Sequence, residues 1–151
     1  MRNAIDDLGM KTRIRVQRYL CKRKKRTYSM LPEELIPYRA SSLGFLAVFW
    51  RMLLFIDQSH KQILSAIVDR FPESSAALNM DYSHLNDFEG CLQVAMNRVT
   101  ALTGIGFPSI QCFFEFCSAY VFNGRTGWLA VTQWFYEQQH RFLFGTASQH
   151  R

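Results

Sequence analysis

The segment from Lys11 to Arg26 limits what this chain can fold into and bind more than any other stretch. It holds nine of the eighteen lysine and arginine residues, and no acidic residue occurs between Leu8 and Pro32. Without these nine cations the formal net charge of +6 would be negative. Such a concentration of charge points to a polyanionic partner, either nucleic acid or an acidic membrane surface, or else to a segment that only aids solubility.

Strand-forming alternation runs from Arg13 to Leu20, where Ile14 and Val16 alternate with polar or charged residues. A period of two with β-branched residues is typical of a β-strand. The polar tip is expected over residues 21–25, and Thr27–Leu31 reads as a return strand. The segment is therefore predicted to form a basic β-hairpin, which is marginal in water unless it docks on a domain or binds a partner.

In the rest of the chain, apolar residues recur at the spacing that is typical of α-helices. Ser41 or Ser42, Ser83 and Ser109 stand where a hydroxyl can cap a helix start, and Pro and Gly residues interrupt the pattern between helices. A turn or short helix is expected over residues 73–82, and a single short turn between Pro32 and Pro37. Five longer helices are predicted, over residues 43–57, 60–71, 83–102, 110–122 and 128–144.

The predicted fold is mainly α, with an N-terminal basic β-hairpin in residues 1–40 and a bundle of about five helices in residues 41–151. The apolar run Leu43–Ile56 contains Arg51 and is shorter than the roughly twenty residues that a membrane span needs, so it is predicted to be a buried helix. The four cysteines form no Cys-x-x-Cys pair and no disulfide pattern. Because the amino end also lacks an apolar signal core, free thiols in the cytoplasm are expected.

Residues 18–32 read Arg-Tyr-Leu-Cys-Lys-Arg-Lys-Lys-Arg-Thr-Tyr-Ser-Met-Leu-Pro. This string resembles the N-terminal zinc ribbon of proteins associated with bacterial insertion sequences, whose pattern is Arg-Tyr/Phe-x-Cys-x-x-Cys-Gly-Arg/Lys-Thr-Phe-Ser followed by Leu-Pro. Residues 35–39 and Ser41-Ser42 match the usual continuation of that pattern, and residues 142–151 also resemble sequences of this family. The resemblance implies a zinc-ribbon hairpin and a role in a mobile element, beside a transposase.

The zinc knuckle of that pattern is degenerate in this chain. Cys21 matches the first cysteine, but the second is replaced by Lys24 and the following glycine by Lys25. No Cys or His occurs in residues 1–12, where the other knuckle would lie. One thiol cannot hold a structural zinc ion, which needs four ligands. We therefore predict that the chain binds no metal and no cofactor. Either its hairpin has lost the zinc ion, or the chain is a truncated or decayed copy of the element's protein.

Cations of the hairpin are the predicted nucleic-acid-binding residues, because each can neutralise a phosphate and release counterions. Phosphate contacts position a protein without reading sequence. Tyr19 and Tyr28 are candidates for stacking on unpaired bases, although such tyrosines more often pack a hairpin on its domain. The predicted DNA-binding residues are Arg13, Arg15, Arg18, Lys22, Arg23, Lys24, Lys25 and Arg26.

Other sites find less support in the sequence. Residues 76–85 have the spacing of a helix-turn-helix, but the second helix would carry His84, Asp87 and Glu89, whose acids repel phosphates. The twelve acidic residues are scattered, and the histidines have no ligand spacing with Cys112 and Cys117. No phosphate-cradling glycine loop is present. We therefore expect no catalytic residues and no enzyme activity.

The sequence thus predicts a non-enzymatic DNA-binding protein of mobile-element origin. The alternative is a helical protein-interaction module whose basic amino end only solvates it, with a transposase or a second copy of the chain as partner. Association of the hairpin with a membrane surface is a third hypothesis. It ranks last, because the segment lacks the amphipathic helical stripe that such binding uses.

Overall fold

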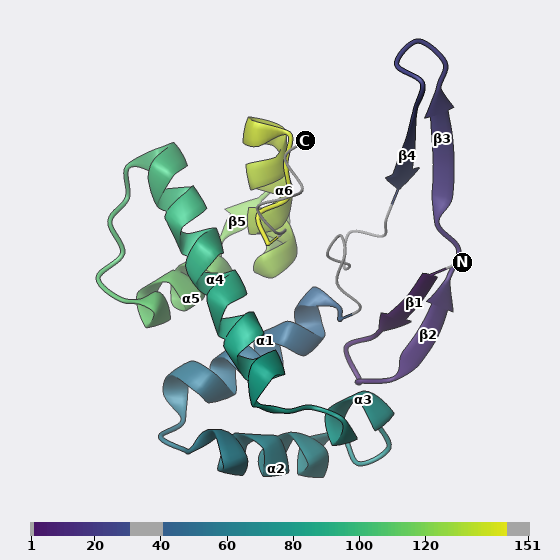
Figure 1. The fold of residues 1–151 in the computed structure, drawn as a ribbon. Coiled ribbons are helices and arrows are strands. Elements are labelled where there is room, and N and C mark those ends of the chain that lie inside the picture. Colours follow the sequence, from purple (N-terminus) through teal and green to yellow (C-terminus); the bar gives the residue numbers. More distant parts are fainter. Residues whose placement is uncertain (1, 31–40, 145–151) are drawn as a thin grey trace.

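The computed structural model describes residues 2–30 and 41–144; for Arg2 and residues 26–30 it describes the backbone only. The described part is mainly helical and carries β-hairpins at its amino end, which confirms the predicted fold class (Figure 1). The expected turn between Pro32 and Pro37 lies outside the described residues. The helices are α1 (Leu43–Phe55), α2 (His60–Arg70), α3 (Ser75–Leu78), α4 (Tyr82–Thr103), α5 (Ile110–Ala119) and α6 (Trp128–Gln139).

The core is built around α1, which packs against α2, α4, α5 and α6. Trp50 is fully buried, and its ring lies 4.9 Å from that of Trp128 and 5.3 Å from that of Phe144. The indole N–H donates to the carbonyl of Phe88 at 2.8 Å, so the polar end of the tryptophan is also satisfied. Helix α1 is thereby fixed to α4 and α6 at one point.

Side-chain caps set most helix starts. Ser42 caps α1 and Ser109 caps α5, which confirms two of the predicted caps. Ser59 caps α2 in a reciprocal arrangement with Gln62. The predicted cap of α4 by Ser83 is wrong, because Asp81 accepts from the first turn instead. Asp81 precedes the helix with an extended backbone, and its carboxylate accepts from the free backbone N–H of His84 in the first turn.

Two predicted helices are too long. Helix α5 ends at Ala119, and the following residues pair as the short strands β5 (Val121–Phe122) and β6 (Arg125–Thr126) around Asn123-Gly124. Asn123 and Gly124 have φ values of 50° and 75°, the left-handed conformations that a tight hairpin turn requires. Helix α6 ends at Gln139 rather than Phe144, because His140 takes a left-handed conformation that helical residues do not adopt.

The amino-terminal segment forms two hairpins, not one. Strand β1 (Arg2–Ile5) pairs with β2 (Lys11–Ile14), and β3 (Gln17–Cys21) pairs with β4 (Arg26–Met30). The single strand predicted over Arg13–Leu20 is therefore wrong: the alternation is continuous, but the hydrogen-bonding partner changes after Ile14. Gly9, with a φ of 75°, lies in the turn of the first hairpin.

The β1–β2 hairpin is attached to the helical bundle by two buried serines. The Ser42 hydroxyl donates to the Asp7 carboxylate, and the Ser42 N–H donates to the Ile5 carbonyl at 2.9 Å. The Ser74 hydroxyl donates to the Gly9 carbonyl. Because Ser42 and Ser74 also cap α1 and α3, the hairpin is tied directly to the starts of two helices. Figure 1 shows it beside these helices.

Candidate nucleic-acid interface

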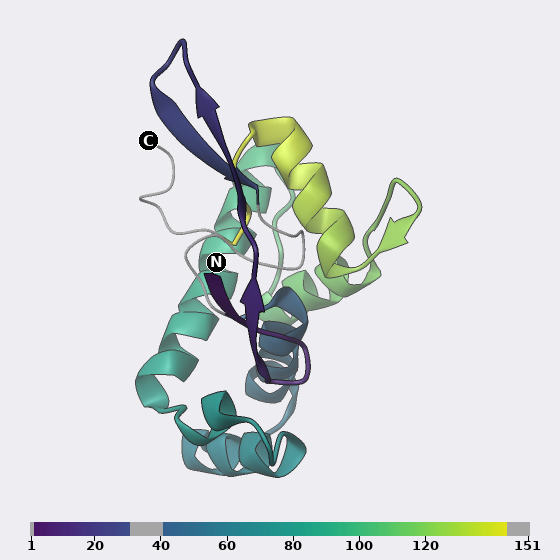
Figure 2. The same cartoon turned by 90° about the vertical axis from the view of Figure 1, so that its right-hand side faces the viewer.

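The β3–β4 hairpin extends away from the bundle (Figures 1 and 2). Its cross-strand pairs end with Cys21 opposite Arg26. Residues 17–20 are all exposed, and successive strand residues point to opposite faces, so both faces of β3 are open to solvent. Tyr19 is 48% exposed and makes no ring contact with another side chain of the described residues. The Tyr28 side chain lies outside the described part.

The tip of this hairpin consists entirely of cations. Lys22, Arg23, Lys24 and Lys25 connect the two strands, and all four side chains are exposed. Lys25 has a φ of 51°. That left-handed conformation costs an L-residue about 1–2 kcal/mol and is free of this cost for glycine. The tip therefore keeps a lysine at a position whose backbone favours glycine.

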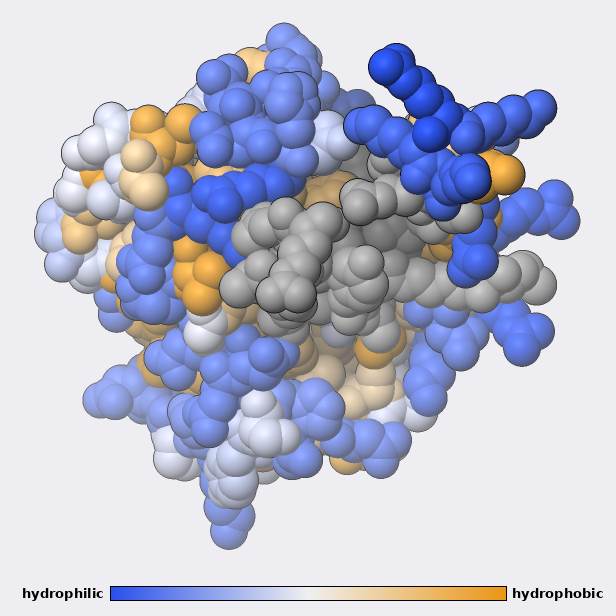
Figure 3. All heavy atoms as spheres, turned by 45° about the horizontal axis from the view of Figure 1, so that its top comes forward, coloured by the Kyte–Doolittle hydropathy of each residue, from blue (hydrophilic) through white to orange (hydrophobic). Residues whose placement is uncertain are grey.

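Seven of the eight predicted DNA-binding residues are placed with their side chains, and all seven are exposed. They form no salt bridge with any carboxylate of the described ranges 2–30 and 41–144. In Figure 3, hydrophilic side chains spread outward at the upper right, where the hairpin comes forward. The side chain of Arg26 lies outside the described part. The seven residues are Arg13, Arg15, Arg18, Lys22, Arg23, Lys24 and Lys25.

Strands β2 and β3 follow one another as a nearly continuous extended segment (Figure 2). On β2, exposed Lys11 and Arg13 alternate with half-buried Thr12 and Ile14, so the cations lie on the outward side. Lys11 was not among the predicted binding residues, although extending the alternation by one step would have included it. From Lys11 to the tip the cations span roughly 36 Å at about 3.3 Å per residue.

The cysteines do not assemble a metal site. Cys21 is half-buried, Cys91 and Cys117 are buried, Cys112 is exposed, and all four are free thiols. Within the part of the chain that the structure covers, no three His, Cys, Asp or Glu side chains lie close enough together to hold a metal ion. Burial raises the pKa of the Cys117 thiol well above its usual value, which keeps that thiol protonated and unreactive.

The helix-turn-helix candidate has a different structure. Helix α3 has only four residues, and the exposed side of α4 carries Asp87 and Glu89 near its start. The first cation along α4 is Arg98, which is 8% exposed and donates to the carbonyls of Phe142 and Leu143 at 3.0 and 2.9 Å. Burial, and then the charge of nearby Arg141, lowers the pKa of Arg98. This arginine holds the chain after α6 and is not presented to a ligand.

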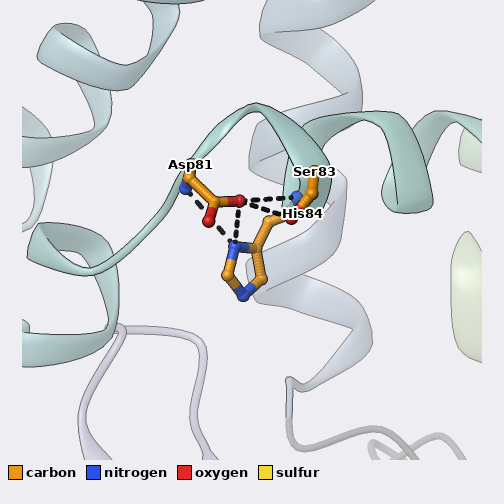
Figure 4. A network of polar contacts seen from close by, with 3 residues as sticks. All are labelled: Asp81, Ser83 and His84. Atoms are coloured by element: carbon orange, nitrogen blue, oxygen red, sulfur yellow. Dashed lines mark hydrogen bonds and ion pairs between the residues drawn. The ribbon is translucent and has the colours of Figure 1, made fainter.

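The start of α4 carries a compact polar cluster of Asp81, Ser83 and His84 (Figure 4). The Asp81 carboxylate accepts from the Ser83 hydroxyl at 2.6 Å and from the His84 N–H at 3.1 Å, and lies 2.8 Å from His84 Nδ1. The hydrogen bond from Ser83, followed by those from His84, lowers the pKa of Asp81 to about 2. The cluster is exposed, and its geometry is that of a helix cap.

This cap makes part of the stability pH-dependent. The pKa of Asp81 is lower in the folded chain than its ordinary value of 3.8, so the contribution of Asp81 is complete above 3.8 and is lost as the pH falls toward about 2. We expect the thermal midpoint of the wild type to drop more between pH 5 and pH 2.5 than that of Asp81→Asn, whose amide still caps the helix but does not titrate in this range. Equal drops would contradict this assignment.

Comparison with known proteins gives no relative. No protein-family model matches the chain, and no curated protein or solved structure is significantly similar to it. Among the described helices, none has the length and apolar character needed to cross a lipid bilayer.

Proposed function

We propose that this protein binds DNA through the phosphate backbone, using the basic β3–β4 hairpin and the strand β2 that precedes it. The observation that carries the proposal is a set of seven exposed cations, five on the projecting β3–β4 hairpin and two on or just after β2. They form no salt bridge with a carboxylate of the described residues. Cations at this density repel one another, and a polyanion relieves that repulsion. A hairpin with both faces of β3 in solvent also gains order by docking.

The dimensions of the basic surface suit duplex DNA. Its span of roughly 36 Å, at about 3.3 Å per residue, is close to one turn of B-DNA, which is about 34–36 Å long. A two-stranded ribbon also fits the major groove. Binding would be insensitive to sequence, since lysine and arginine contacts to phosphates carry no base information. Tyr19, half-exposed on β3, is available to stack on an unpaired base.

The proposal includes a mobile-element origin, in the cytoplasm, without enzyme activity and without a bound metal. It is supported by the resemblance of residues 18–32 to the zinc ribbon of insertion-sequence proteins. The structure adds one supporting detail. Lys25 stands where that pattern has glycine, and its φ of 51° is a conformation that glycine adopts freely. Lys24 and Lys25 would then contact phosphates at the turn that holds metal in the related pattern.

The test is direct binding of the full chain to a fluorescein-labelled 20-base-pair duplex, followed by fluorescence anisotropy. We expect a dissociation constant of about 1–100 µM at near-physiological salt, with the same value for two duplexes of unrelated sequence. Single-stranded DNA of equal length serves as the comparison, and tighter binding to it would favour stacking on Tyr19. No binding of either DNA at 100 µM protein would overturn the proposal.

A further inference from the structure

One side of helix α1 is apolar and is only partly covered by the described part of the fold. Val48 and Met52, one helical turn apart, are only half-buried, although both belong to the most apolar helix of the described chain. At the end of the same helix, Phe55 is 44% exposed and Ile56 is 41% exposed. The other sides of α1 pack against α2, α4, α5 and α6, as expected for a buried helix, so the exposed apolar residues gather on one side. Contiguous exposed apolar surface of this kind marks interaction sites.

This partly covered side of α1 forms the floor of a groove of about 350 Å³. Phe114 of α5 and Trp128 of α6 line the groove together with Val48 and Met52 of α1. Because Ile56 is exposed, the groove is open toward solvent rather than closed over a small ligand. Such an open apolar groove beside a helix is the shape that receives the apolar face of another helix.

Two arginines give the groove its charge. Arg51 of α1 and Arg70 of α2 both line it, and both are exposed. The Arg51 guanidinium lies 5.7 Å from the ring centre of Phe114, and that of Arg70 lies 5.6 Å from the ring centre of Phe71. Neither forms a salt bridge with a carboxylate of the residues that the structure places. Each therefore offers donors for a carboxylate from outside.

We propose that this groove binds an acidic amphipathic helix of a protein partner. The apolar side of that helix would cover Val48, Met52 and Phe114, and its carboxylates would pair with Arg51 and Arg70. A second copy of this chain fits poorly. A two-fold axis through the groove would bring the arginines of one copy against those of the other, in a protein whose net charge is already +6.

This inference goes beyond DNA binding, and it depends on residues that the basic hairpin does not share. It gives the helical domain a function of its own, with a partner of opposite charge to the protein. The same chain would then hold DNA through its amino-terminal hairpin and a second protein through α1. Failure of one proposal leaves the other standing.

The test uses a labelled synthetic peptide in which leucines form one helical face and glutamates the other. Its affinity for the full chain is measured by fluorescence anisotropy, and the shifted amide signals are mapped by nuclear magnetic resonance. The groove variant is Arg51→Glu with Arg70→Glu. The matched control is Lys22→Glu with Lys61→Glu, which changes the net charge equally and leaves the groove intact. A second peptide with lysine in place of glutamate tests charge complementarity.

We expect amide signals of Val48, Met52 and Phe114 to shift, and the groove variant to bind the acidic peptide about tenfold more weakly than the control variant. The lysine peptide should not bind. The proposal is overturned if the control variant loses as much affinity as the groove variant, since the basic hairpin would then be the attracting surface. It is also overturned if the amide signals of the groove stay unchanged when the acidic peptide is added. Phosphatidylglycerol vesicles are titrated in parallel, and groove signals that respond only to the vesicles would assign the groove to a lipid and likewise overturn the proposal.

Discussion

Replacement of Lys22, Arg23 and Lys24 by glutamate is expected to lower the affinity for duplex DNA by about 100-fold at roughly 0.1 M salt, because three phosphate contacts become three repulsions. These side chains form the tip of the β3–β4 hairpin and face solvent. Their loss removes no contact from the core, so the thermal midpoint should be unchanged. Lys25 is left in place, which keeps the backbone of the turn as it is.

The matched control replaces Arg51, Lys61 and Arg70, three exposed cations of α1 and α2, by glutamate. The change in net charge is the same. Because exposed charges act over only about 10 Å at 0.1 M salt, this variant should lose less than about threefold in DNA affinity. Similar losses in both triple variants, measured by anisotropy with one duplex, would show that overall charge and not the hairpin drives binding.

Replacement of Gly44 by alanine is expected to destabilise the protein, although alanine normally stabilises a helix. A Cβ at position 44 would lie 2.4 Å from the Asp7 carboxylate, which would have to move away from Ser42. Loss of a hydrogen bond to a charged group costs about 1.5–3 kcal/mol, which exceeds the helix gain of about 0.5–1 kcal/mol. We expect a net loss of about 1 kcal/mol in the free energy of unfolding, measured with urea.

Gly90 is the matched control, since it also lies within a helix and a Cβ there would meet nothing within 4 Å. Gly90→Ala should stabilise by about 0.5–1 kcal/mol. In the background of Asp7→Ala, Gly44→Ala should likewise become stabilising, because the carboxylate that it displaces is gone. A destabilising Gly44→Ala in that background would mean that Asp7 does not mediate the effect.

Local chemistry explains which parts of the fold were predictable. Ser42 and Ser109 could be recognised as caps because a hydroxyl before an apolar run satisfies free N–H groups within the next turn. The basic turn was predictable because cations occupy every position of the tip. Such features depend only on residues a few positions apart, so the sequence alone contains them.

Pairing and docking could not be predicted in the same way. Strand β1 was missed although its turn carries a local signal: the Asp6 carboxylate accepts from the N–H groups of Leu8 and Met10 at 3.0 and 2.9 Å. The helix predicted over residues 110–122 runs too far, although Asn123-Gly124 just after it favours a hairpin turn. The contacts of Ser42 with Asp7 and of Ser74 with Gly9 join segments 35 and 65 residues apart, and no short sequence pattern predicts them.

The groove beside α1 could not be predicted from the sequence either. The apolar run of α1 predicted burial, and apolar periodicity cannot tell a side covered by the same chain from a side left open. Arg51 was the available signal, because a charge within a buried helix needs a partner. Arg51 and Arg70 line the same groove because of the way α1 and α2 meet, and only the folded structure shows this arrangement.

The most direct test of the account is the slope of the logarithm of DNA affinity against the logarithm of salt concentration, measured on the wild-type chain between about 50 and 300 mM salt. Each neutralised phosphate contributes about −0.9 to this slope, so use of most of the basic hairpin predicts a slope of about −5 or steeper. The triple tip variant should bring the slope nearer to zero by about three. A wild-type slope near zero would contradict the claim that these cations bind the phosphate backbone.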